Sequence, residues 1–176
     1  MHHQVSELFK GAEELRIYLL ENNEVSFLSF ADENFRKLFV VASASALEAE
    51  ICQTLLAFAH KNLSEKHVLV HFIQRKAIER QYHTWFDWRS ANVNSFLGLF
   101  GDNFKKFASN RISNDEILIA SCRAFLELGL LRNRLVHDDF SSFTLEKTTH
   151  EIYKLFSSAC TFAETLRIML DEFIEN

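Results

Sequence analysis

The sequence contains no proline and only four glycines in 176 residues. Proline and glycine form most of the turns in β-sandwiches and barrels, so their scarcity disfavours those folds. Hydrophobic residues make up 48% of the chain, which argues against a disordered or low-complexity protein. We therefore expect an all-α protein. A chain of this length suits one domain with a large core, spanning residues 1–176.

Apolar residues recur at helical spacing along almost the whole chain, without a linker or an internal repeat. The pattern predicts a bundle of four to five main helices plus short extra helices. The main helices are expected at about Gln4–Glu21, at Asp32–Lys61, after Ser64, after Ser113 and after Thr144. Ser64, Ser113 and Thr144 are the expected N-caps, and Ser113 and Glu116 form a capping-box pattern. The stretch Tyr82–Arg111 is expected to be irregular.

Three cysteines, Cys52, Cys122 and Cys160, each lie among apolar residues. An odd number of widely spaced cysteines indicates buried thiols in a reducing compartment, not a disulfide framework. The first fifteen residues lack the apolar core of a signal peptide, and no uninterrupted apolar run is long enough to span a membrane. The sequence thus predicts a cytoplasmic protein with no membrane partner, and it suggests no cofactor.

The formal net charge of −5 argues against a basic protein that coats nucleic acid. Charge is unevenly distributed, however. Residues 61–89 carry six basic and three acidic side chains, a local +3 that leaves −8 for the remainder. Such a segment can attract RNA phosphates if it folds near a binding site, or it can be an ordinary solvated helix face.

One short segment gathers groups that suit phosphate chemistry. Arg132, Asn133, Arg134 and His137 lie near the end of a predicted helix. Arginine donates forked hydrogen bonds to phosphate oxygens, and histidine exchanges a proton near neutral pH. Together they could cleave RNA without a metal: a base takes the 2′-hydroxyl proton, the alkoxide attacks phosphorus, and arginine stabilises the developing charge. The products would be a 2′,3′-cyclic phosphate and a 5′-hydroxyl.

Helix geometry separates two of these groups. Arg132 and His137 are five residues apart, so they point roughly 140° away from each other around a helix, whereas Asn133 and His137 share a face. A second copy related by a two-fold axis could supply the opposite wall of a cleft, which favours a homodimer. The alternative is a structural role, because cations interact favourably with the dipole at a helix C-terminus.

Arg132-Asn133-Arg134-Leu135-Val136-His137 resembles the motif of the HEPN domains (higher eukaryotes and prokaryotes nucleotide-binding): arginine, a polar residue, a short gap and histidine. The segment Ala46–Glu50 and the stretch Trp88–Gly101 resemble the branch associated with RiboL-PSP proteins. The resemblance covers about residues 35–170. It implies an all-α bundle that dimerises. Many HEPN proteins are metal-independent endoribonucleases of toxin–antitoxin, abortive-infection and defence systems, whereas others are binding modules without activity.

Carried over from that family, Arg132 and His137 would be the catalytic pair, and Asn133 would orient the imidazole or the phosphate. The resemblance also implies RNA as the substrate and an antitoxin or defence protein as a possible partner. Family members often have a small residue after the motif histidine, whereas this chain has Asp138 and Asp139. Two carboxylates there could hold the histidine in its protonated form or repel phosphate.

Several further residues are candidates with a structural alternative. Glu48 lies in the middle of a helix among small residues, where it could hydrogen-bond the motif or face solvent. Arg134 could bind RNA, pair with Asp138 or be solvated. The other candidate RNA-binding residues are Arg75, Lys76 and Arg80. His67 and His71 have the spacing of a metal pair but no third ligand, so no metal site is expected. Trp85 and Trp88 are expected in the core or an interface, with base stacking as the alternative.

The sequence therefore supports two functions. The intact Arg132 and His137 favour a metal-independent endoribonuclease, acting as a toxin or defence effector. The acidic balance, together with Asp138 and Asp139, favours a non-catalytic HEPN module that dimerises or binds a nucleotide or RNA. A plain helical scaffold is a third possibility if the motif lies far from any cleft.

Overall fold

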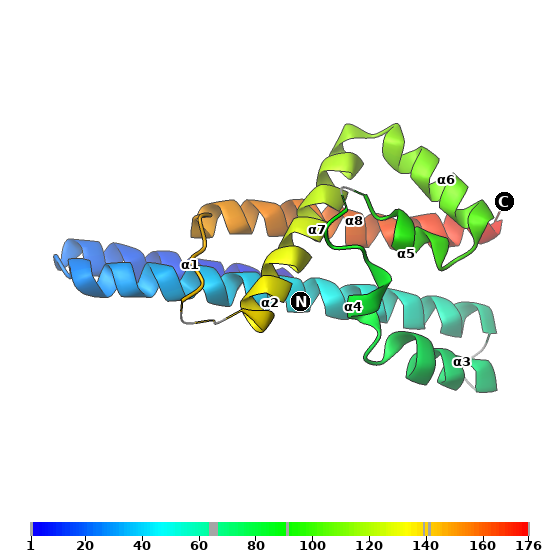
Figure 1. The fold of residues 1–176 in the computed structure, drawn as a ribbon, viewed down its shortest axis with the longest axis horizontal. Coiled ribbons are helices and arrows are strands. Elements are labelled where there is room, and N and C mark those ends of the chain that lie inside the picture. Colours follow the sequence, from blue (N-terminus) through cyan, green and yellow to red (C-terminus); the bar gives the residue numbers. More distant parts are fainter. Residues whose placement is uncertain (1, 64–66, 91, 139, 141, 176) are drawn as a thin grey trace.

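The computed structural model describes residues 2–63, 67–90, 92–138, 140 and 142–175, and within them all regular structure is helical (Figure 1). The all-α expectation is therefore confirmed. The long helices are α1 (His2–Glu21), α2 (Val25–Leu63), α7 (Glu116–His137) and α8 (Thr149–Glu175). The shorter ones are α3 (Val68–Phe72), the π-helix η1 (Ile73–Ile78), α4 (Tyr82–Trp85), α5 (Asn94–Gly98) and α6 (Asp102–Ser113).

Helix α2 runs the length of the molecule and organises the fold (Figure 1). Its 39 residues span about 58 Å at the usual helical rise. Helix α1 packs against its N-terminal half as an antiparallel hairpin, α8 packs alongside it, and α7 crosses it near its middle (Figure 1). Short helices cover the C-terminal half. The fold therefore places the end of α7 against the centre of α2.

The turn between α1 and α2 is tighter than the sequence predicts. Asn23 adopts a left-handed conformation with φ of 58°, which asparagine tolerates, and the Glu24 amide donates to the Leu19 carbonyl at 2.9 Å. Helix α1 ends at Glu21, as the sequence predicts. However, α2 begins at Val25 and not near Asp32, because this compact turn lets the next helix start at once.

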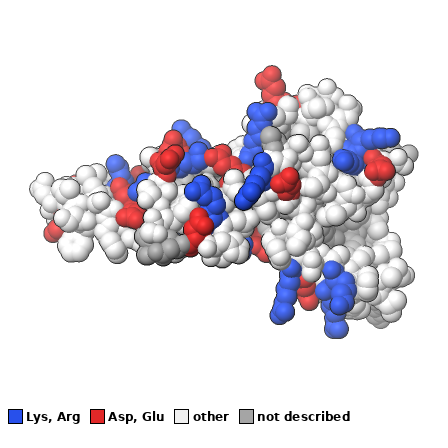
Figure 2. Space-filling model, viewed as in Figure 1, with Lys and Arg blue, Asp and Glu red and all other residues white. Residues whose placement is uncertain are grey.

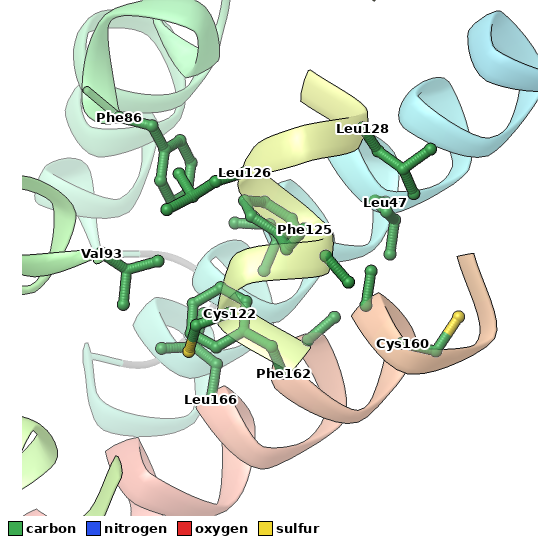
Figure 3. Packing of buried hydrophobic residues seen from close by; sticks show 14 of the residues in the cluster. Leu47, Phe86, Val93, Cys122, Phe125, Leu126, Leu128, Cys160, Phe162 and Leu166 are labelled. Atoms are coloured by element: carbon green, nitrogen blue, oxygen red, sulfur yellow. The ribbon is translucent and has the colours of Figure 1, made fainter. Parts of the chain in front are cut away.

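The core is centred on Phe125 of α7 (Figure 3). Its ring centroid lies 5.0 Å from that of Phe86, in the segment after α4, and 5.0 Å from that of Phe162 on α8. Small residues at Ser43, Ala44 and Ala46 of α2 are buried at the crossings, where they allow close approach of the neighbouring helices. These contacts fix α7 between α2 and α8.

Two of the predicted helix caps are wrong, first Ser113 and then Thr144. Ser113 is the last residue of α6, and its Oγ donates to the Asn110 carbonyl at 2.9 Å. Helix α7 is instead capped by Asp115, whose Oδ1 accepts from the amides of Ile117 and Leu118 at 2.8 and 3.1 Å. The proposed box at Ser113 fails because that residue still belongs to the preceding helix.

Helix α8 begins later than predicted. Thr144 does not cap it; a capping box at Thr148 and Glu151 does. The Thr148 amide donates to Glu151 Oε2 at 2.7 Å, and the Glu151 amide donates to Thr148 Oγ1 at 3.2 Å. The predicted cap Ser64 lies outside the described residues. Helix α3 is capped by His67, whose Nδ1 accepts from the Leu69 amide at 3.2 Å.

The three cysteines are free thiols, with Cys122 and Cys160 buried and Cys52 partly buried. Burial raises the pKa of Cys122 and Cys160 to about 12. Burial, and then the charge of Glu48, raises the pKa of Cys52 to about 11. These thiols are therefore poor nucleophiles near neutral pH.

Helix α2 is long and apolar enough to cross a membrane when judged by length and composition alone, by a criterion that tolerates up to two charged residues in the window. Its best 18-residue window has a mean hydropathy of 1.3, and 33% of that window is buried inside the protein. The core helix of a folded protein meets the same criterion. The contacts of α2 with α1, α7 and α8 give it such a core role.

Candidate nucleic-acid cleavage site

The last two turns of α7 carry the motif residues Arg132, Asn133, Arg134 and His137. The helix ends at His137, and the amide of the capping residue Asp138 donates to the Arg134 carbonyl at 2.8 Å. Arg132 and Asn133 are partly buried, whereas Arg134 and His137 are exposed. The predicted position of the motif at a helix end is thus confirmed.

Arg132 and His137 line two different hollows, as the helical spacing predicts. The first hollow is a narrow crevice between α2, α4 and α7, and it contains Arg132. The second lies beside the C-terminus of α7 and contains Arg134, His137 and Asp138. Asn133 and Trp88 line both hollows. These two side chains therefore form the partition between the arginine and the histidine.

The crevice brings opposite charges close to a buried phenol. Glu48 and Arg132 both line it, together with Tyr82. Arg132 Nη1 donates to Asn133 Oδ1 at 3.2 Å, and no hydrogen bond joins Arg132 to Glu48. Burial raises the pKa of Tyr82 well above its ordinary value; the Glu48 carboxylate raises it further and the Arg132 guanidinium lowers it. Among the described residues, Glu48 is thus a neighbour of the motif that shares its crevice with Arg132.

The second hollow offers two arginines beside the histidine. Arg89 and Arg134 line it with His137, and so do the carboxylates of Asp87 and Asp138. The Arg134 guanidinium lies 4.8 Å from the ring centroid of Phe143, a cation–π contact, and it forms no ion pair with Asp138. This hollow therefore combines a proton-exchanging group with donors for phosphate oxygens.

Trp88 forms the shared wall because a glycine of α7 makes room for it. A Cβ atom at Gly129 would lie 2.9 Å from Trp88 Cη2 and closer still to Cζ3 and Cε3. The indole Nε1 donates to the His83 carbonyl at 3.0 Å, which fixes the ring from the other side. Gly129 precedes Asn133 by one helical turn. Trp88 consequently packs against the backbone of α7 directly next to the motif.

Helix α2 also holds the segment that follows the motif. Lys37 is only 2% exposed, and its Nζ donates to Glu33 Oε1 and to the Phe140 carbonyl, both at 3.0 Å. The neighbouring Arg36 donates from Nη1 to the Leu145 carbonyl at 2.9 Å. These bonds connect the chain after His137 to α2. The position of the α7 end therefore depends on α2 as well as on α7 itself.

The other predicted RNA-binding residues lie elsewhere. Arg75 and Lys76 are exposed on η1, Arg80 follows it, and none of them lines the two hollows that contain motif residues. Helix η1 packs against α2 and α3. His67 is used as a helix cap, and no group of three His, Cys, Asp or Glu residues in the described chain could hold a metal ion. Asp139 lies outside the described residues.

Sequence reasoning missed several residues of the two hollows. Trp88 and Trp85 were both expected in the core or an interface. The structure makes Trp88 a wall of both hollows. Trp85 is buried in the core, at 8% exposure. Arg89 and His83 were not assigned to the site. One signal was available: Gly129 lies inside a strongly predicted helix, where glycine costs about 1 kcal/mol, so a close packing partner was to be expected there.

The architecture and the motif together define an all-α domain with the Arg-Asn-x-x-x-His signature at a helix end. The family model of RiboL-PSP-HEPN matches residues 6–172, so the chain belongs to the RiboL-PSP-HEPN family. This confirms the resemblance drawn from the motif and extends it over nearly the whole chain. No curated protein and no solved structure matches the chain.

Proposed function

We propose that this protein is a metal-independent endoribonuclease that cleaves RNA through its own 2′-hydroxyl, leaving a 2′,3′-cyclic phosphate and a 5′-hydroxyl. One observation carries the proposal. Arg132 and His137 line adjoining hollows at the end of α7, and Asn133 and Trp88 separate them. A single helix end thus presents a phosphate-binding side chain and a proton-exchanging group on the two sides of a shared wall.

In the proposed reaction His137 takes the proton from the 2′-hydroxyl, and the alkoxide attacks the adjacent phosphorus in line with the departing 5′-oxygen. The P–O5′ bond breaks, and the departing oxygen takes up a proton from the imidazolium or from water to become the 5′-hydroxyl. Arg132 stabilises the charge that develops on the phosphoryl oxygens. Asn133 Oδ1 already accepts from Arg132, so it orients the guanidinium. Because the two catalytic groups face different hollows, the reacting phosphate is bound between two copies of the site related by a two-fold axis.

The RNA is held mainly by the hollow that contains His137. Arg89 and Arg134 line it and supply forked donors for neighbouring phosphates. In-line attack requires a flexible ribose, so the substrate is single-stranded RNA or a loop. The assignment of Arg75, Lys76 and Arg80 to RNA binding stays a prediction. We further propose that the protein acts in the cytoplasm as a toxin or defence effector, with an antitoxin or defence protein as its partner.

Cleavage of a labelled single-stranded RNA in excess EDTA tests the proposal. We expect cleavage by the wild type, a loss of about 10²–10⁴-fold in His137→Ala and of about 10²–10³-fold in Arg132→Ala. Arg123→Ala is the matched control, since Arg123 is exposed on the same helix and lines neither hollow. Intact RNA with the wild type, or equal cleavage by wild type and His137→Ala, would contradict the proposal.

The second candidate is a non-catalytic module that binds RNA or a nucleotide. Asp87 and Asp138 line the His137 hollow, and carboxylates there repel a scissile phosphate from His137, which favours a function without cleavage. RNA retention without cleavage, measured by fluorescence anisotropy, distinguishes the module from the enzyme. Expression in cells adds a second readout, since toxicity that disappears with Arg132→Ala indicates catalysis.

A further inference from the structure

A third hollow, lined by side-chain amides, lies beside the N-terminal half of α7, next to α5 and α6. Its apolar lining includes Val93 and Cys122, which are only 2% and 3% exposed. Its volume is about 400 Å³, within the range of sites that bind small ligands. We call it the amide hollow after its polar lining, which consists of Asn92, Asn94, Ser109, Asn110 and Ser113.

The three asparagines of the amide hollow present hydrogen-bond donors, because their oxygens are already used. Asn92 Oδ1 accepts from the Asn94 backbone amide at 3.0 Å, and Asn94 Oδ1 accepts from Ser109 Oγ at 3.0 Å. Asn110 Oδ1 accepts from Asn114 Nδ2 at 3.3 Å. Within the part of the chain that the structure describes, the Nδ2 groups of Asn92, Asn94 and Asn110 form no hydrogen bond. Each of these groups therefore has two N–H donors to offer a ligand.

The amide hollow is also uncharged. None of the described residues that line it is charged, and the surface over α5 is mostly white on the face shown in Figure 2. Phosphate and carboxylate groups are usually bound by cations, so neutral donors suit the carbonyl oxygens of a neutral group. Val93 and Cys122 add an apolar surface for a flat ring. A nucleobase combines carbonyl oxygens with a flat apolar face.

Donors in the hollow discriminate between the bases. Uracil and guanine carry a carbonyl oxygen, O4 or O6, where cytosine and adenine carry an amino group. A carbonyl oxygen accepts from an asparagine NH₂ group. An amino group would instead meet another donor, and both groups would lose their hydrogen bonds to water without replacement. The amide hollow therefore favours the keto bases, uracil and guanine, over the amino bases.

The amide hollow and the His137 hollow open on the same side of α7. Cys122 lines the first and Asn133 lines the second. These residues are eleven positions apart, which is about three helical turns, so they face the same direction. The centres of the two hollows lie about 20 Å apart along α7, at 1.5 Å per residue. A few nucleotides of single-stranded RNA span this distance.

One segment of the chain joins the two hollows. Phe86 lines the His137 hollow and Val93 lines the amide hollow, and Figure 3 shows both side chains on one side of α7. The Asp87 backbone amide donates to Ser95 Oγ at 3.1 Å, which holds the start of the segment against its end. Peptide carbonyls could also accept from asparagine donors. RNA is favoured because the same strand can place a phosphate in the His137 hollow, where Arg89 and Arg134 offer donors.

We propose that the amide hollow binds a keto base, uracil or guanine, of single-stranded RNA, a few nucleotides from the bond that is cut. Asn94 and Asn110 donate to the carbonyl oxygens of the base, and Val93 and Cys122 contact its ring. The hollow thus selects the sequence next to the cleavage position. The placement of the base relative to the cut rests on the proposed function, whereas the preference for keto bases does not.

Nucleoside binding by the full-length protein tests the preference without any cleavage. Correlation spectra of ¹⁵N-labelled protein record the side-chain amide signals during titration with four neutral nucleosides. Uridine and cytidine form one keto and amino pair, and inosine, which has the C6 carbonyl of guanosine, forms the other with adenosine. We expect the signals of Asn94 and Asn110 to shift with uridine or inosine, with a dissociation constant at least about tenfold below that of its amino partner. The tighter of uridine and inosine identifies the base as uracil or guanine.

Two variants replace a donor by an acceptor in the amide hollow. Asn94→Asp retains an oxygen for Ser109 Oγ and loses the NH₂ group, so we expect the keto preference to disappear. Asn110→Asp makes the same change on α6 and should have the same effect. The matched control is Asn103→Asp, since Asn103 is exposed on α6 and does not line the hollow; it should retain the preference. Circular dichroism checks that all three variants fold.

Four results would overturn the proposal: no shift with uridine or inosine, equal affinity for keto and amino nucleosides, a preference that survives in both hollow variants, or binding of N-acetylglycinamide as tight as that of uridine. The last result would make a peptide the ligand.

Cleavage of an adenine-rich RNA that carries one uracil or guanine at successive positions tests the placement. We expect the wild type to cut at a fixed offset from that base and Asn94→Asp to lose the offset; a cut without a fixed offset would contradict the placement. Keto-nucleoside binding with RNA that stays intact supports the amide hollow and contradicts the proposed function. Cleavage without any nucleoside preference does the reverse.

Discussion

Replacing Gly129 by alanine perturbs the contact that seats Trp88 against α7. The new Cβ atom would overlap ring carbons of Trp88 one helical turn before Asn133. The indole has little room to retreat, since its ring centroid lies 4.9 Å from that of Phe86 and 6.1 Å from that of Phe125. We therefore expect the ring to shift only by displacing the aromatic core, and both hollows of the site to change shape.

The magnitude follows from two opposing effects. Alanine is favoured over glycine inside a helix by about 1 kcal/mol. Overpacking a close-packed site costs about 1–3 kcal/mol, and the constrained ring puts this site at the upper end of that range. The free energy of unfolding should fall by about 1–2 kcal/mol. For a chain of this size, the midpoint of thermal unfolding should fall by about 2–8 °C.

Gly11→Ala is the matched control, because a Cβ atom at this helical position meets nothing within 4 Å. It should raise the free energy of unfolding by about 0.5–1 kcal/mol. Urea denaturation at one fixed protein concentration measures both variants. In a Trp88→Leu background, Gly129→Ala should lower the free energy of unfolding much less than it does in the wild type. The reason is that the smaller side chain removes the overlap.

The reasoning would be refuted if Gly129→Ala were as stable as Gly11→Ala. A loss of stability that persists in the Trp88→Leu background would also refute it, because the cost would then lie outside the Trp88 contact.

Three further predictions concern contacts around the site. Lys37→Met should lower the free energy of unfolding by about 1–3 kcal/mol in urea, because the Phe140 carbonyl loses a buried donor; an unchanged value would contradict this. Thr148→Ala should cost about 1 kcal/mol and Thr144→Ala much less, because only Thr148 caps α8; equal losses would place the cap elsewhere. Glu48→Gln should lower the pKa of Cys52 from about 11, so that alkylation of this thiol becomes faster at pH 8 than in the wild type. An unchanged rate would mean that the Glu48 charge does not reach Cys52.

The helical class and the position of the motif could be predicted from the sequence, because both depend on local spacing. Arg132 and His137 were expected on different sides of one helix, and they line different hollows. The caps were less predictable. Ser113 with Glu116 and the region around Thr144 carry suitable residue types, but Asp115 and Thr148 are the actual caps. Several nearby side chains can cap a helix, and the choice depends on where the preceding segment ends.

The sequence by itself determined that the chain is helical and that Arg132 and His137 share one helix end. The reason is that proline is absent, apolar residues follow the helical period, and the motif spans less than two turns. Only the tertiary structure decided what surrounds that end. Trp88 on Gly129, Glu48 in the crevice and Lys37 on the following loop are contacts between segments far apart in sequence. Such contacts depend on how the helices cross and pack, which no local pattern of residues specifies.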